Sequence, residues 1–146
     1  VVRGNLGRLA GRAGDTVTAR HLLEEALAGF EAIDATGFVL ETRLRLLELD
    51  APDHLAVASI ERLLLDGEQA GAGATVEAPG RRLLGTAYRV AGADDRARSE
   101  LERAVTAARA DSLGAELVAS LDELGALGDH AAATEAATTR LALGIT

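Results

Sequence analysis

The sequence of 146 residues has no cysteine, no tryptophan and no lysine, so all 15 of its basic residues are arginine. Without cysteine the chain can form no disulfide, no thiolate metal site and no thiol nucleophile. It has no apolar run of the roughly 18 residues that a membrane span requires, and no signal peptide at its start. We therefore expect a cytoplasmic protein that neither enters nor binds a membrane.

Positive charge and aromatic side chains are also scarce. The net charge is −8, from 23 acidic and 15 basic residues, and aromatic residues make up 2% of the chain. A general nucleic-acid binder would carry a basic surface, so this composition argues against nucleic acid as a partner. Hydrophobic residues make up 48% of the chain and are mostly alanine, leucine and valine, which suits helices packed closely on helices.

Apolar residues recur at helical spacing along almost the whole sequence, and no segment alternates with a period of two, so we expect an all-α fold. After a first helix, Asp15 or Thr16 begins a second, and Asp53 is expected to cap a fourth. The segment Gly71–Gly80 is expected to be a loop, with Pro79 in the first turn of the fifth helix. It lacks the lysine and the preceding strand of a phosphate-binding loop. The expected helices cover about 16–33, 38–49, 54–70, 79–91, 96–110, 113–126 and 130–143.

A long-range repeat explains the spacing of the small residues. Leu6-Gly7 and Ala19 recur as Leu84-Gly85 and Ala97, displaced by 78 residues in each case (84 − 6 and 97 − 19). Such a gap holds two helical hairpins averaging 39 residues, so we predict four hairpins, at about 1–34, 38–70, 79–110 and 113–143. Glycine in one helix and alanine in the next let two backbones approach closely. The residues expected to pack the repeats are Leu6, Gly7, Ala19, Leu23, Ala26, Leu84, Gly85, Tyr88, Ala97, Leu101 and Ala104.

This pattern resembles the tetratricopeptide repeat, with Leu-Gly-x2-Tyr in the first helix (helix A) and Ala-x3-Phe-x2-Ala in the second (helix B). The sequence departs from it because no tryptophan opens a repeat, leucine replaces the usual phenylalanine, and Arg109 stands at the usual proline position. The resemblance implies one domain, 1–146, forming a right-handed superhelix of antiparallel hairpins. Because the first residues already follow the apolar spacing of a helix interior, we expect the chain to be a fragment of a longer protein.

The segments 4–49 and 76–127 also resemble a more specific group, the C-terminal helical-repeat region of actinobacterial signalling proteins. In these proteins a class III nucleotide cyclase domain and an AAA-type ATPase module precede the repeats, and related tails occur in LuxR-type ATP-dependent regulators. The resemblance implies a regulatory, protein-binding module without catalytic activity of its own. Its partner would be a protein, a peptide or another domain of the parent chain.

Arginines are the candidate binding residues, because helices A line the concave groove of tetratricopeptide stacks. In that register Arg8, Arg12, Arg82 and Arg89 face the groove, and Arg43 or Arg45 joins them. Guanidinium groups there would bind carboxylates of a partner segment. The alternative is that these arginines pair with acidic residues of neighbouring helices.

Enzymatic and metal chemistry find little support in the sequence. The histidines His21, His54 and His130 lie apart, without the i, i+4 spacing of a metal site. Paired carboxylates are explained by helix starts and outward faces, so we expect no catalytic residue, no metal and no cofactor. Two other functions stay open: a metabolite-sensing domain that binds an effector in the groove, and a structural spacer or dimerisation arm that associates through apolar solenoid ends.

Overall fold

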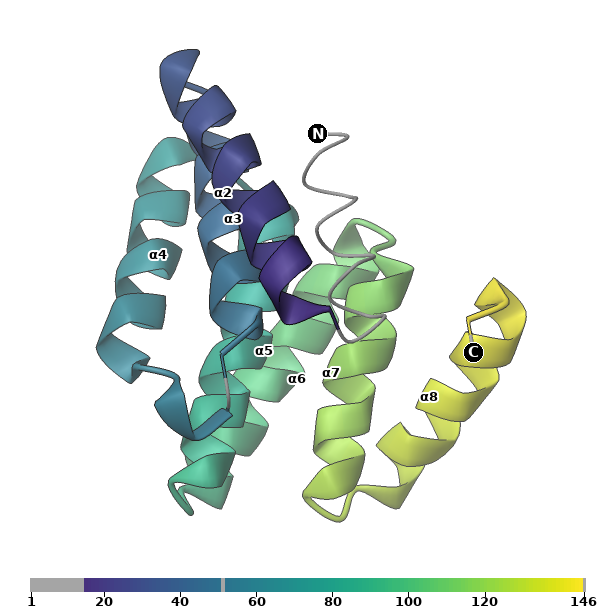
Figure 1. Cartoon of the computed structure of the whole chain (residues 1–146). Helices are drawn as coiled ribbons and strands as arrows, with labels where there is room; N and C mark the ends of the chain where they lie inside the picture. The colour runs from purple at the N-terminus through teal and green to yellow at the C-terminus, as the bar shows by residue number, and fades with distance from the viewer. Residues whose placement is uncertain (1–14, 51, 146) are drawn as a thin grey trace.

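A computed structural model describes residues 15–50 and 52–145 of the chain, and these residues form helices joined by short turns, without a strand (Figure 1). The all-α prediction is therefore confirmed. None of the described helices is long and apolar enough to cross a membrane. The elements are α2 (Thr16–Ala32), α3 (Thr36–Glu48), the 3-10 helix η1 (Pro52–His54), α4 (Val57–Ala70), α5 (Ala74–Val90), α6 (Asp94–Ala110), α7 (Gly114–Ala126) and α8 (His130–Leu143).

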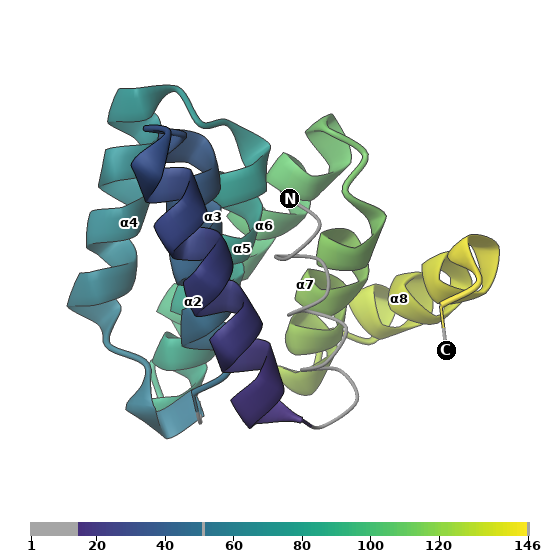
Figure 2. The same ribbon diagram turned by 45° about the horizontal axis from the view of Figure 1, so that its top comes forward.

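The helices are arranged in the order of the chain. Each helix packs on the next one, and α5 also packs on both α3 and α7, so these three helices form an inner layer with α5 in its middle. Figures 1 and 2 show α2, α3 and α4 at one end of the molecule and α8 at the other. In the predicted hairpins α3, α5 and α7 are the A helices. The right-handed superhelix stays a prediction.

Two predicted helix starts have different outcomes. Asp15 caps α2, because its carboxylate accepts a hydrogen bond from the backbone N–H of Thr18 at 2.9 Å. The prediction that Asp53 caps the fourth helix is wrong. Asp53 lies in η1, and α4 begins at Val57 with Ala56 as its N-terminal cap. The chain turns once more before α4, so this helix is shorter at its start than its apolar pattern suggests.

The predicted loop at 71–80 is also wrong, since α5 begins at Ala74 and Pro79 lies inside it. Only Gly71 to Gly73 form the turn, and both glycines have the positive φ that other residues rarely adopt (66° and 72°). The third hairpin therefore starts about five residues earlier than predicted (79 − 74). Burial explains why the helix tolerates a proline: Val76 and Pro79 are almost completely enclosed, so packing offsets the lost backbone hydrogen bond.

The core lies between the layers in two clusters, one around α3, α4 and α5 and one around α6, α7 and α8. Gly85 of α5 sits where the two helices of the third hairpin approach closely. A Cβ atom at this position would lie 2.6 Å from Cγ of Leu101 and 3.3 Å from the carbonyl oxygen of Ala97. Tyr88 is half-buried and lies beneath the guanidinium of Arg96, 5.7 Å from the ring centre.

Most of the residues expected to pack the repeats are buried. Leu6 and Gly7 lie outside the described residues. The buried ones are Ala19, Leu23, Ala26, Leu84, Gly85, Ala97, Leu101 and Ala104.

Candidate functional site

The arginines expected to line a binding groove are engaged with glutamates of neighbouring helices wherever the structure describes them. Nε of Arg82, on α5, donates to Oε2 of Glu116 on α7 at 2.9 Å, and its terminal nitrogen donates to Glu48 on α3. Nε of Arg89 donates to Oε2 of Glu123 at 3.0 Å. These contacts agree with the alternative that the arginines pair with acidic residues of the same chain. Arg8 and Arg12 lie outside the described residues.

Arg45 extends these contacts into a buried cluster. Its guanidinium donates to Oε1 of Glu116 at 2.6 Å and to Oε1 of Glu48 at 3.0 Å, and the side chains of Arg45 and Glu116 are only 9% and 10% exposed. We call Arg45, Glu48, Arg82 and Glu116 the inner ion cluster. It joins α3, α5 and α7, and Nε of Arg45 has no hydrogen-bond partner among the described residues.

The electrostatics of the inner ion cluster are dominated by burial and by opposite charge. Burial alone would raise the pKa of Glu116, because a low-dielectric surrounding disfavours the carboxylate. The charges of Arg82 and Arg45 and their hydrogen bonds outweigh that effect and hold the pKa of Glu116 below its ordinary value. The carboxylate is therefore ionised at neutral pH, which suits a structural cross-link and does not suit a general acid.

The glutamates of these pairs were missed in the sequence, although a signal exists. Glu48 with Arg82, Arg82 with Glu116, and Arg89 with Glu123 are each separated by 34 residues. The same contact is thus repeated between successive A helices, from α3 to α5 and from α5 to α7. A search for opposite charges at one constant separation between these helices would have found all three pairs.

The three histidines are exposed and line none of the hollows described below. Nε2 of His21 lies 3.1 Å from Oε1 of Glu25, one turn along the same helix, and the side chains of His54 and His130 point into solvent. Within the described part of the chain, no three histidine or carboxylate side chains are close enough to hold a metal ion. Ser120 is fully buried, and its hydroxyl has no hydrogen-bond partner there. These residues do not form an arrangement for nucleophilic or metal chemistry.

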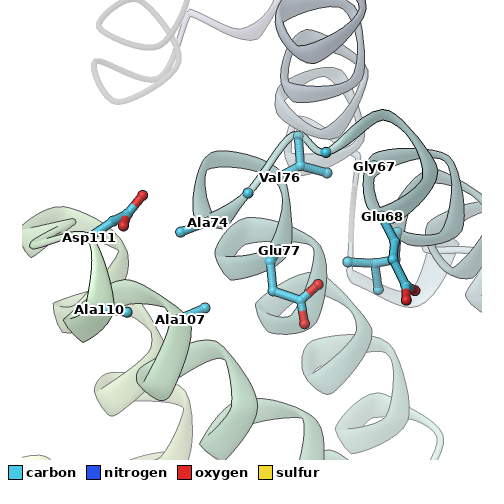
Figure 3. A pocket seen from close by; sticks show the side chains of 11 residues that line it. Gly67, Glu68, Ala74, Val76, Glu77, Ala107, Ala110 and Asp111 are labelled. Atoms are coloured by element: carbon cyan, nitrogen blue, oxygen red, sulfur yellow. The ribbon is translucent and has the colours of Figure 1, made fainter.

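One surface hollow lies where the turn between α4 and α5 meets the end of α6 (Figure 3), and we call it the acidic pocket. Its volume is about 480 Å³, and its floor consists of small or apolar residues such as Leu64, Val76 and Ala107. Three carboxylates surround it. Figure 3 shows Glu77 of α5 between Glu68 near the end of α4 and Asp111 at the end of α6.

The three carboxylates differ in their partners. Oε1 of Glu77 accepts a hydrogen bond from Nε of Arg81 at 2.9 Å, and Arg81 also reaches Glu100 on α6. Glu68 and Asp111 have no ion-pair partner among the described residues and are exposed to solvent. The pocket therefore carries an excess of negative charge, which would attract a positively charged group.

A second hollow of about 550 Å³, which we call the α3–α4 groove, lies between α3 and α4. The half-buried Leu46 and Leu47 of α3 supply most of its apolar surface. Leu63 of α4 belongs to the core and is 9% exposed at its floor, and the small residues Ala58 and Ser59 line one side. Arg43 and Arg62 stand on its two sides. This groove therefore combines apolar surface with two guanidinium groups on a protein of net charge −8.

A third hollow, of about 690 Å³, lies between α7 and the end of α8. Arg140 and Asp122 both line it, and the guanidinium donates to the carboxylate at 2.5 Å. The pair satisfies the charges within this hollow, so the hollow offers less to a charged ligand than the other two.

The comparisons with known proteins add no relative to this description. No family model matches the chain, and neither a curated protein nor a solved structure is significantly similar to it.

Proposed function

We propose that this chain is a non-catalytic protein-interaction module of a larger signalling protein. The observation that carries the proposal is the α3–α4 groove, where leucine side chains of two neighbouring helices line an open surface hollow flanked by charged residues. Grooves between helices with apolar anchors and a polar rim are typical sites for a helical segment of another protein. The resemblance of the repeats to the tails of cyclase-linked and ATPase-linked signalling proteins supports the regulatory part of the proposal.

The proposal differs from the sequence-based prediction in the surface that it uses. Arg82 and Arg89 already hold carboxylates of their own chain, and a partner could use them only by displacing those glutamates. Removing one member of a buried ion pair leaves an uncompensated charge at a cost of about 3 to 5 kcal/mol. We therefore assign Arg82 to the framework of the inner layer. A contribution of Arg8 and Arg12 to partner binding stays a prediction.

A second candidate function is the sensing of a small molecule, and the acidic pocket favours it. Its volume of about 480 Å³ falls within the roughly 300 to 1,000 Å³ typical of small-molecule sites. Glu68 and Asp111 on its rim would select a positively charged ligand such as an amine (Figure 3).

A dimerisation or spacer role is a third candidate. Leu141 and Leu143 on α8 are 84% and 50% exposed, and such leucines at the end of a helical stack suit contact with a further helix.

Affinity capture and native mass spectrometry together separate these functions. The immobilised chain is incubated with lysate of its source, and bound proteins are eluted with an excess of the free chain, while native spectra report bound small molecules. A protein that binds in stoichiometric amount and is displaced by the free chain supports the interaction module. A small cation lost in the Glu68→Gln/Asp111→Asn variant supports the sensor. The absence of both, with a concentration-dependent dimer, would contradict both and support the third function.

A further inference from the structure

The two arginines of the α3–α4 groove are exposed and only weakly paired with carboxylates of their own chain. The nearest carboxylate to Arg43 is that of Glu31, at 3.8 Å, and the side chain is 45% exposed; Nε of Arg62 lies 3.3 Å from Oδ1 of Asp66, and the side chain is 72% exposed. Ion pairs this exposed contribute little free energy because water and salt screen them. Both guanidinium groups can therefore exchange their present carboxylates for those of a partner at little cost.

The charge of the groove selects the sign of the charge that a partner segment must carry. Among the residues that line the groove, Arg43 and Arg62 outnumber Asp66, so the lining carries one net positive charge while the chain carries −8. Glu31 of α2, which is 3.8 Å from Arg43, lies outside the lining and would have to give up this contact when a partner binds. A basic segment would be repelled by these two arginines and drawn instead toward the acidic pocket. A segment with carboxylates on both sides of an apolar stripe fits the two arginines and the leucine surface together.

The secondary structure of the partner follows from what the groove offers. The described residues that line it belong to two helices, α3 and α4, whose backbone groups are hydrogen-bonded within the helices. An extended peptide would find no strand edge there to pair with, so the groove suits a helix, which satisfies its own backbone hydrogen bonds, better than a strand. The lining residues of α4 run from Ala58 to Asp66, which at 1.5 Å per residue span about 12 Å, about two turns of a second helix.

Helix α8 of a second copy, which carries exposed leucines, does not provide such a segment. The exposed leucines Leu141 and Leu143 lie on α8, but their charged neighbour is Arg140, and α8 contains one acidic residue, Glu135. Contact of α8 with the groove would bring arginine against arginine. We therefore take the occupant to be an acidic segment of another polypeptide and not α8 of a second copy.

We propose that the α3–α4 groove binds an acidic amphipathic helix, whose apolar stripe packs on Leu46, Leu47 and Leu63 and whose carboxylates pair with Arg43 and Arg62. This proposal rests on the function proposed above and names the chemistry of the partner. The guanidinium groups fix the register of the bound helix, and the leucines supply most of the affinity.

Two designed peptides of matched sequence test the proposal by fluorescence anisotropy. Both carry leucines at i, i+3, i+4 and i+7, with alanine and glutamine elsewhere. One has glutamate beside the leucine stripe, and the other has lysine at the same positions. We expect saturable binding of the glutamate peptide, weaker binding of the lysine peptide, and loss of affinity for the glutamate peptide as salt is raised.

Three variants of the chain locate the binding. Arg43→Glu/Arg62→Glu reverses the charge and is expected to weaken binding at least about tenfold. Ala58→Trp adds bulk at an exposed position of the groove and should block it without removing a contact. Arg103→Glu is the matched control, since this arginine is 54% exposed on α6, away from the groove. Circular dichroism melting of each variant verifies that it folds.

The possible results are distinct. Binding of the glutamate peptide that Arg103→Glu retains, and that the two groove variants lose, supports the proposal. Equal affinity for the two peptides, unchanged affinity of the groove variants, or no saturable binding would overturn it. If a lysate protein is then still captured stoichiometrically by Arg43→Glu/Arg62→Glu, the interaction function stands and only the groove assignment fails. If no protein is captured either, both proposals fail.

Discussion

Gly85 provides a quantitative test of how the third hairpin is packed. Replacing it with alanine adds one methyl group that would lie 2.6 Å from Cγ and 2.8 Å from Cδ2 of Leu101. Carbon atoms in contact normally stand about 3.5 Å or more apart, so α5 and α6 must separate by about 1 Å or Leu101 must move. Leu101 is completely buried, and the carbonyl oxygen of Ala97 lies 3.3 Å from the added atom on the same side. Neither neighbour can move freely.

The expected magnitude comes from two opposing effects. Alanine is favoured over glycine inside a helix by about 1 kcal/mol, and overpacking of a dense core costs about 1 to 3 kcal/mol. Gly29 on α2 is the matched control, because a Cβ atom there would have no neighbour within 4 Å. Gly29→Ala should therefore stabilise the chain by about 0.5 to 1 kcal/mol. We expect Gly85→Ala to be less stable than Gly29→Ala by about 1 to 3 kcal/mol.

Urea denaturation followed by circular dichroism measures this difference. With a slope of about 2 kcal/mol per molar urea, the two midpoints should differ by roughly 1 M. A double-mutant cycle identifies the cause, since Gly85→Ala should cost less in a Leu101→Ala background than in the original chain. Equal stability of Gly85→Ala and Gly29→Ala, or a cost independent of residue 101, would refute close packing at Gly85 as the reason for glycine there.

Two further predictions concern the charged groups of the fold. Glu116→Gln leaves Arg45 without its buried charge partner and should destabilise the chain by on the order of 3 kcal/mol at pH 7, measured by urea denaturation. Because the pKa of Glu116 is lower in the folded chain than in the unfolded one, its contribution is present above its ordinary pKa of about 4.5 and falls as the pH drops below that value. The difference between the two proteins should therefore shrink on acidification; a constant difference from pH 7 to pH 3 would contradict this linkage. Asp129→Ala removes the cap of α8, where the carboxylate accepts a hydrogen bond from the N–H of Ala132 at 3.0 Å, and should cost about 1 kcal/mol in thermal or urea melts. Asp129→Asn retains the cap and should cost less, and equal losses for the two variants would assign the effect to the ion pair with Arg98 instead.

The sequence predicts a helix correctly where residues at its own two ends determine where it starts and stops. The last helix is observed at His130–Leu143 as predicted, because Asp129 caps its start and Gly144 ends it in the left-handed conformation. The start of α5 could not be found in the same way. A sequence with several glycines and a proline is typical of a loop, and only the enclosure of Val76 and Pro79 by other helices makes it helical. Tertiary packing overrides local propensity at such a segment.

The contacts at the candidate sites were even harder to predict from the sequence than the helix ends, because they depend on how the helices pack. The sequence shows that Arg82 lies on an A helix, but its partners Glu48 and Glu116 are each 34 residues away on two other helices. The contact between Arg45 and Glu116 joins residues 71 positions apart. Which glutamate meets which arginine depends on the register between α3, α5 and α7, and a rotation of one residue would turn a side chain by about 100°. The three surface hollows likewise result from the way helices meet.

Arg43 and Arg45 show that position on a helix decides whether an arginine pairs inside the fold or stays exposed at the surface. The two arginines are two positions apart on α3, so their side chains leave the helix about 200° apart. Arg45 faces the inner layer, is 9% exposed and contacts Glu116, whereas Arg43 faces the α3–α4 groove and is 45% exposed. A chain with 23 acidic and 15 basic residues can easily neutralise every arginine with its own carboxylates. Arginines that stay exposed and weakly paired beside apolar surface are therefore the better candidates for partner binding, and Arg43 with Arg62 meets that condition where Arg82 does not.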